Sequence, residues 1–203
     1  MYIEFFSQRL AIAIGCLTLV TSLSAQPPGR LDATALLLEQ EVIGVNTSIP
    51  IQEYRLPEGY RYKVFVLAGY YRRPLLVSRR RTAVSLTLAP QINPVWYFPD
   101  SGASWEAGVN LGFEYRVRLG HFAPYLAIGV GPHYFPTRTA RQARGFIFSD
   151  NFTAGFHYLV DYGAQPYFIH TEFTFRHLSN AEIRSPNAGV NNYLMTFGVS
   201  RVF

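Results

Sequence analysis

Residues 105–119 alternate between apolar side chains and polar or small ones. Every second residue from Trp105 to Leu119 is apolar, and the positions between them hold glycine, asparagine, glutamate or arginine. Side chains two apart share a face of a β-strand, so this segment predicts one long strand with one apolar face. A soluble strand usually has about five or six residues, whereas a tilted membrane strand needs about ten. Length and alternation together are typical of a strand that crosses a membrane with its apolar face toward lipid.

Less regular alternation elsewhere predicts eight strands in all, and an even number is what a single-chain bacterial barrel contains. The predicted fold class is therefore all-β: one domain, residues 26–203, forming an eight-stranded antiparallel transmembrane β-barrel of the bacterial outer membrane. The strands are expected at 34–45, 60–71, 83–95, 104–119, 122–134, 146–160, 165–179 and 191–203.

The last predicted strand sets the orientation of the barrel. Its apolar face ends at Phe203, which resembles the C-terminal signal of the barrel-assembly machinery, although Arg201 stands where an apolar residue is usual. With Phe203 on the periplasmic side, the shorter connections become periplasmic and the longer ones external, as such barrels show. The short periplasmic connections are 120–121 and 161–164, and the external ones are 96–103, 135–145 and 180–190, with Trp96 and Trp105 at the outer interface. The arginine-rich stretch 72–82 is the exception, because it is long and falls on the periplasmic side.

The lumen of an eight-stranded barrel is narrow enough for side chains to fill it. Ionisable residues occupy many of the positions that face inward, which predicts a packed polar network and disfavours a channel. The inward set includes Glu114, Arg116, His133, His157, His170, Glu172 and Arg176.

The N-terminus has the order of features found in a secretory signal peptide. Arg9 precedes an apolar run from Leu10 to Val20, and residues 21–25, which are small apart from Leu23, end at Ala25. The run is short for a membrane-spanning helix, so we expect a signal peptide at residues 1–25 and export to the outer membrane. Cys16, the one cysteine, lies inside this segment, so the mature chain is expected to lack both a disulfide and a thiol nucleophile.

The formal net charge is +5, and Lys63 is the one lysine among 18 basic residues. Arginine binds phosphate and carboxylate in a bidentate manner, so this composition indicates that the protein binds an anionic partner, such as a phosphorylated glycolipid. The alternative is that the charge serves solubility. Arg138, Arg141 and Arg144 lie in one predicted external loop, either as substrate-binding residues or as a solvated basic loop. No spacing of ligands indicates a metal or a cofactor, and we expect no nucleic-acid partner.

The segment FTFRHLSNAEI, residues 173–183, places His177 and Ser179 in the same row as two phenylalanines. In the predicted topology this row points to lipid near the outer end of its strand. One interpretation is catalytic, because a hydrolase that acts on an outer-leaflet lipid needs its nucleophile on the outer wall. The simpler interpretation is that these are polar residues of the kind that strand ends at the interface tolerate. A serine nucleophile also requires a base and a third group that orients the base.

The segments RHLSNA (176–181) and PNAGVN (186–191), with RGFIFSD (144–150) upstream, resemble motifs of the PagL-type lipid A 3-O-deacylases, or acyloxyacyl hydrolases. The likeness covers about the last sixty residues. It implies an eight-stranded outer-membrane barrel that removes the ester-linked acyl chain at the 3-position of lipid A, without metal or cofactor. By position, Ser179 is the nucleophile, His177 the general base, and Asn180 an oxyanion donor.

Two positions depart from that family. Its third catalytic member is a glutamate, and Asn191 occupies the position here, fourteen residues after the histidine. An asparagine orients a histidine but does not stabilise imidazolium with a full charge, and Asp150 is the candidate substitute acid. Glu182 stands where glycine is expected. Its backbone N–H remains available to an oxyanion, but its negatively charged carboxylate disfavours an oxyanion nearby.

Two hypotheses follow. The first is a serine esterase that acts on lipid A, with lipopolysaccharide as substrate, outer-membrane lipid as its surroundings and the barrel-assembly machinery as its partner during biogenesis. The second is a catalytically silent barrel with a structural or surface-interaction role. The absence of glutamate at position 191 is the feature that distinguishes the two hypotheses. The sequence leaves open whether the protein forms a homodimer.

Overall fold

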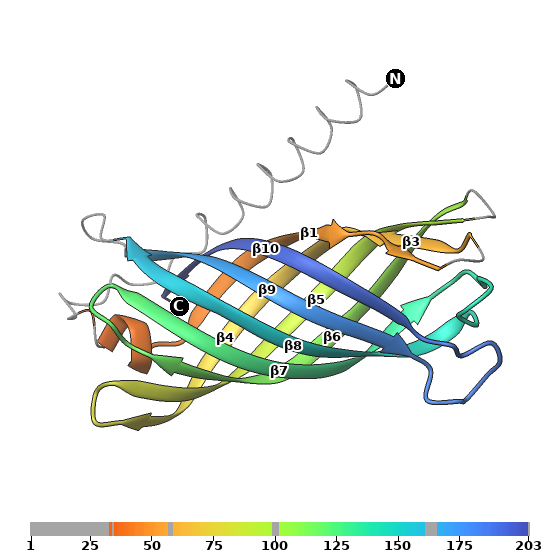
Figure 1. Ribbon diagram of the computed structural model, residues 1–203. Helices are drawn as coiled ribbons and strands as arrows, with labels where there is room; N and C mark the ends of the chain where they lie inside the picture. The colour runs from red at the N-terminus through yellow and green to blue at the C-terminus, as the bar shows by residue number, and fades with distance from the viewer. Residues whose placement is uncertain (1–32, 34, 57–58, 99–101, 161–165, 203) are drawn as a thin grey trace, which may run out of the picture.

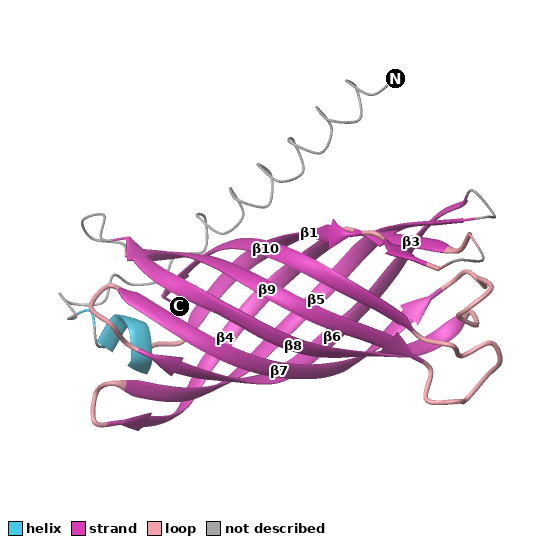
Figure 2. Ribbon diagram, viewed as in Figure 1, coloured by secondary structure: helices cyan, strands magenta, loops and turns pink. Residues whose placement is uncertain are grey.

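The computed structural model describes residues 33, 35–56, 59–98, 102–160 and 166–202, so the predicted signal peptide lies outside the described residues. Antiparallel strands close into a barrel in the order β1–β4–β5–β6–β7–β8–β9–β10 and back to β1 (Figures 1 and 2). The predicted fold class is confirmed. The elements are η1 (Ala35–Glu39), β1 (Val42–Gln52), β2 (Tyr54–Arg55), β3 (Arg61–Val64), β4 (Val66–Ser78), β5 (Thr82–Phe98), β6 (Gly102–Val117), β7 (Phe122–Phe135), β8 (Gly145–Val160), β9 (Tyr167–Ser179) and β10 (Val190–Val202).

The first predicted strand, 34–45, is wrong. Its beginning forms the short helical turn η1, whose residues Ala35 to Leu38 are buried inside one end of the barrel. The first strand instead begins at Val42, and its outward side chains include Ile43, Val45 and Ile49. A uniform apolar run such as Ala35–Leu38 has no period of two, so it packs as a plug rather than as a strand with two different faces.

Two other predicted boundaries are also wrong. The strand expected at 60–71 is divided into β3 and β4, and β4 continues to Ser78 through a bulge between Pro74 and Leu76. The long external loop expected at 96–103 is mostly strand, because β5 runs to Phe98 and β6 starts at Gly102. Residues 95–97 pair with β6 on one side, and residues 95–98 pair with β3 on the other, a contact between distant segments that alternation alone does not reveal.

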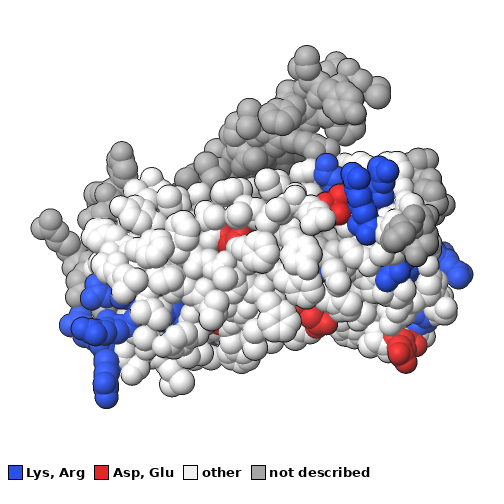
Figure 3. Space-filling view, in the orientation of Figure 1, with Lys and Arg blue, Asp and Glu red and all other residues white. Residues whose placement is uncertain are grey.

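The two ends of the barrel differ as the predicted orientation requires. The longer connections 136–144 and 180–189 and the β2–β3 hairpin lie at one end, which we take as external (Figure 1). The turn that carries Arg79, Arg80 and Arg81 lies at the other end, where β10 ends. Figure 3 shows Lys and Arg side chains gathered at the two ends of the face in view. Charge therefore gathers at both ends, as expected for a wall that crosses lipid.

The outer wall is apolar along the middle of the strands. Leu111, Phe113, Ile128 and Phe152 are each about half exposed or more, at 49%, 49%, 56% and 59%. An apolar surface of this extent indicates contact with lipid. No helix in the described part of the chain is long and apolar enough to span a membrane.

Inside, two apolar clusters close the lumen. One lies at the external ends of the strands and includes Tyr62, Val95, Phe135 and Leu178; the other lies at the opposite end. The second cluster packs η1 against the wall and includes Leu36, Leu37, Leu38, Val42, Tyr70, Ala83, Ala123, Leu159, Phe168 and Val202. Apolar packing at both ends disfavours a water-filled channel.

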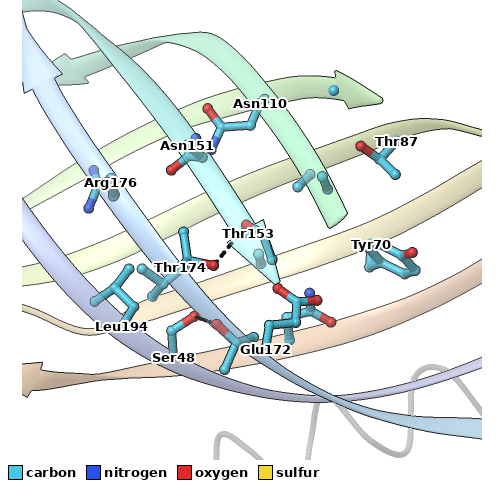
Figure 4. A pocket seen from close by; sticks show the side chains of 18 of the residues that line it. Ser48, Tyr70, Thr87, Asn110, Asn151, Thr153, Glu172, Thr174, Arg176 and Leu194 are labelled. Carbon is cyan, nitrogen blue, oxygen red and sulfur yellow. Dashed lines mark hydrogen bonds between the residues drawn. The ribbon is translucent and has the colours of Figure 1, made fainter. Parts of the chain in front are cut away.

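Between the clusters lies the predicted polar network. Glu114 accepts a hydrogen bond from the Tyr70 hydroxyl at 3.0 Å, and its carboxylate lies 3.2 Å from Arg116 Nε and 3.3 Å from His157 Nε2. A cavity of about 120 Å³ lies in the middle of the lumen, with Ser48, Asn110, Asn151 and Glu172 among its lining residues (Figure 4). This volume is below the roughly 300 Å³ at which small-molecule sites begin, so the lumen is a poor place for a lipid substrate.

Candidate active site

Three polar side chains form a row across the outer wall near its external end. His177 on β9 lies opposite Asp150 on β8 and opposite Asn191 on β10, and residues paired in this way point to the same face. His177 Nδ1 lies 2.6 Å from Asn191 Oδ1. Because an amide oxygen only accepts, Nδ1 carries the proton and donates it, and Nε2 is left as the basic nitrogen. The contact orients the histidine as a general base requires.

Ser179 follows two residues after His177 on the same face, opposite Phe148 of β8. At about 3.3 Å per residue, the two Cα atoms are roughly 6.6 Å apart, a gap that an imidazole and a hydroxymethyl group bridge. In the described part of the chain no hydrogen bond engages Ser179 Oγ. Catalytic hydrogen bonds of this kind often form only when substrate is bound.

A tight turn follows the serine. The Ile183 N–H donates to the Asn180 carbonyl at 3.0 Å, and Ala181 and Glu182 between them have φ of 50° and 65°. This is a type I′ turn, which glycine and asparagine normally occupy, so alanine and glutamate adopt it at a cost in strain. Among the described residues, no hydrogen bond engages the backbone N–H of Ala181 or Glu182. Two backbone donors next to the serine are therefore available to an oxyanion.

Asn180 is buried, and its contacts hold this turn to the next segment. Its backbone N–H donates to Asn187 Oδ1 at 2.7 Å, and its Nδ2 donates to the Arg184 carbonyl at 2.6 Å. An amide Nδ2 carries two hydrogens, so one donor is left after the bond to Arg184. The oxyanion role of the Asn180 side chain stays a prediction that depends on this second hydrogen.

Two external loops are tied together by Arg141. Its Nε donates to the Gly189 carbonyl at 3.0 Å and its Nη2 to the Ala188 carbonyl at 2.5 Å, while its own carbonyl accepts from the Ala188 N–H at 3.0 Å. Arg141 therefore holds the backbone beside the site, a role that the sequence did not indicate. Arg138 and Arg144 are exposed, and their binding of phosphate stays a prediction.

Gly189 lies directly against the His177 ring. Its φ is +69°, and a Cβ added there would be 2.8 Å from His177 Cε1 and 3.4 Å from Nε2. No side chain fits between this backbone and the imidazole without displacing the ring. The position thus requires glycine for two reasons, its left-handed backbone and the close approach of the His177 ring.

If His177 is the general base that the sequence predicts, Gly189→Ala is expected to lower kcat by about a hundredfold, since a displacement of about 1 Å at a reacting group costs that much. The rate of ester hydrolysis by purified protein measures this. Gly120→Ala is the matched control, because Gly120 has nearly the same φ, +68°, with nothing within 4 Å of an added Cβ. Equal losses in both variants would show that backbone strain, and not contact with His177, accounts for the effect.

A buried network braces the strand that carries the site. Arg176, next to His177 but facing the lumen, forms an ion pair with Glu106 and donates from Nε to Ser149 Oγ at 3.2 Å. Glu106 also accepts hydrogen bonds from Tyr62 at 2.9 Å and from Asn93 at 2.5 Å. Since rigid support improves the precision of a site, the lumen network holds the strand of His177 in place.

Asp150 lies beside His177, but no hydrogen bond or ion pair joins the two within the described residues. Neighbouring strands are about 4.8 Å apart, so a change of side-chain rotamer can bring its carboxylate to the imidazole. In the same residues no group of three or more His, Cys, Asp and Glu side chains is arranged to hold a metal ion.

The family model described as lipid A 3-O-deacylase (PagL) matches residues 67–200, well over half of the chain. The chain belongs to the PagL family. In fold it is similar to a crystal structure of the outer membrane enzyme PagL, with a TM-score of 0.52 and 13% identity over 78% of this chain and 97% of that one. The outer membrane protein OprG from Pseudomonas aeruginosa gives a TM-score of 0.45 and 14% identity over 81% of this chain and 96% of OprG. No match was found among curated protein sequences.

Membership of the PagL family and the closed barrel place the protein in the outer membrane. The geometry also explains why glycine suits one of the two positions at which this sequence departs from the family. The position where glycine was expected, Glu182, has φ +65°, a conformation that glycine adopts without strain.

Glu182→Gly is expected to relieve this strain and to remove a negative charge beside the proposed oxyanion. A charge about 4 Å away in water changes a rate by roughly fivefold, so we expect kcat to rise about two- to fivefold. Initial rates of ester hydrolysis test this, and Glu182→Gln separates the two effects because it removes the charge and keeps the strain. A fall in kcat for both variants would contradict the expectation.

Proposed function

We propose that this protein is a serine esterase of the outer membrane that hydrolyses the acyl ester at the 3-position of lipid A. The contact of 2.6 Å between His177 Nδ1 and Asn191 Oδ1, with Ser179 on the same outward face, is the observation that carries the proposal. It supports a base held in the correct tautomer beside a serine on the lipid-facing wall. An ester buried in the outer leaflet reaches such a wall without leaving the membrane.

The proposed reaction has two steps. Ser179 Oγ attacks the ester carbonyl while His177 Nε2 takes its proton, and collapse of the tetrahedral intermediate releases the sugar hydroxyl, which receives that proton from His177. The serine then carries the acyl chain. Water, deprotonated by His177, attacks this acyl-enzyme and releases the fatty acid, and the proton returns to Ser179.

The oxyanion of each intermediate needs donors beside Ser179. We assign this role to the unengaged backbone N–H groups of Ala181 and Glu182 and to the second Nδ2 hydrogen of Asn180. Backbone donors fixed by a tight turn need no reorganisation during the reaction, which makes them effective.

Purified protein in detergent, incubated with lipid A, tests the proposal directly. We expect release of one fatty acid per molecule, with the remaining ester-linked and amide-linked chains intact. A folded barrel that releases no fatty acid would instead support the silent barrel with a structural or surface-interaction role.

A further inference from the structure

The β2–β3 hairpin carries a group of basic side chains that the active site does not use. Arg55 on β2, and Arg61 and Lys63 on β3, are exposed on the outward side of the external end. Arg55 and Arg61 are direct cross-strand partners. We call these three residues the hairpin patch.

Aromatic rings lie beside the hairpin patch. Arg61 is paired with Phe98 on β5, and its guanidinium lies 5.8 Å from the centre of that ring. Lys63 is paired with Trp96, and its Nζ lies 5.3 Å from the centre of the Phe65 ring. Aromatic side chains of a membrane barrel mark the interface between lipid tails and headgroups. The hairpin patch is therefore at the height of the outer-leaflet headgroups.

The charges of the hairpin patch are only partly balanced. Arg55 forms an ion pair with Glu53 at 2.8 Å, whereas Arg61 and Lys63 form no ion pair within the described residues. Like charges directly opposite each other in a sheet are destabilising, as with Arg55 and Arg61. An anion bound between them removes this repulsion, and arginines bind phosphate oxygens in a bidentate manner.

The hairpin patch is near the candidate active site. The pairing of Gln52 with Tyr193 places the chain leading into β2 beside β10, and β10 lies beside β9, which carries His177. At about 4.8 Å between strands, Arg55 is roughly 10 Å around the wall from His177. Arg141 also links the two regions, because its guanidinium lies 5.8 Å from the centre of the Tyr54 ring.

We propose that the hairpin patch binds the phosphate groups of an outer-leaflet glycolipid and so orients the substrate whose ester reaches Ser179. The orienting role rests on the proposed esterase function, whereas phosphate binding by the hairpin patch does not. The glycolipid is favoured over a protein partner because the cations lie beside interfacial aromatic rings on a wall that faces lipid.

The test is direct binding by the Ser179→Ala protein in detergent, so that no turnover is needed. The probes are bisphosphorylated lipid A, the same lipid after removal of both phosphates, and inorganic phosphate. The variant replaces Arg55, Arg61 and Lys63 with glutamine. Each cation near a lipid surface contributes about a fivefold change in affinity, so we expect the affinity for the bisphosphorylated lipid to fall about a hundredfold.

The matched control replaces Arg79, Arg80 and Arg81 with glutamine, which lowers the net charge equally at the opposite end of the barrel. We expect this control to bind bisphosphorylated lipid A as tightly as the parent, and the dephosphorylated lipid to bind both variants alike. Inorganic phosphate is expected to compete only weakly, since it lacks the acyl chains. Equal loss of affinity in the two variants, or no dependence on the lipid phosphates, would overturn the proposal. Failure to release fatty acid from lipid A, by contrast, would count against the esterase alone.

Discussion

Replacing Ser179 with alanine is expected to lower kcat for ester hydrolysis by at least a thousandfold. Ser179 forms the covalent intermediate in the proposed mechanism, and alanine has no hydroxyl to take its place. His177→Ala is expected to cost about as much, because the serine is a weak nucleophile without its base. Combining the two should cost little more than either, since residues that act as a unit are strongly non-additive. Initial rates with purified protein measure all three.

Ser78→Ala is the control, because Ser78 is an exposed serine at the opposite end of the barrel. It should retain full activity. A Ser179→Ala protein that is folded and still hydrolyses the ester at a tenth of the parent rate would rule out this serine as the nucleophile.

Asn191→Glu is expected to raise kcat by at least about tenfold. The asparagine already orients His177 through the contact of 2.6 Å, but an amide does not stabilise the imidazolium that forms when the serine loses its proton. Exchanging the acid for its amide costs about 10⁴-fold in a serine protease triad, which sets an upper limit for the reverse change here. Steady-state kinetics measure the gain, which should be in kcat rather than in KM.

The same kinetics determine the role of Asp150. If its carboxylate supplies the missing charge from the other side of His177, Asp150→Asn lowers kcat of the parent protein about tenfold. The same substitution then has little effect on Asn191→Glu, because the glutamate has taken over. A uniform loss in both backgrounds would instead indicate that Asp150 acts on substrate binding or on the strand, and not through the histidine.

The outward row of the site could be predicted from sequence because a β-strand has a strict period of two. Once the apolar face of residues 105–119 is assigned to lipid, the side-chain direction of His177 and Ser179 follows from parity alone. The flanking positions of Asp150 and Asn191 followed from parity and from the order of the strands. The register confirms both positions.

Other features depend on contacts between distant segments, which periodicity does not encode. The helical turn at 35–39 was mistaken for a strand because four consecutive apolar residues have no period. The end of β5 pairs with β3 as well as with β6, and it forms strand where a loop was expected. The basic loop indicates either a substrate-binding or a solvated role for Arg141, whereas its position against Ala188 and Gly189 follows only from the folding of two loops onto each other.

The central claim is that Ser179 removes an acyl chain from lipid A in the membrane. The most direct test is mass spectrometry of lipid A from a Gram-negative host that expresses this chain, beside a host that expresses Ser179→Ala. We predict a loss of mass equal to one hydroxyacyl chain with the parent protein and no change with the variant. Unchanged lipid A in a host whose outer membrane contains the folded parent barrel would contradict the account.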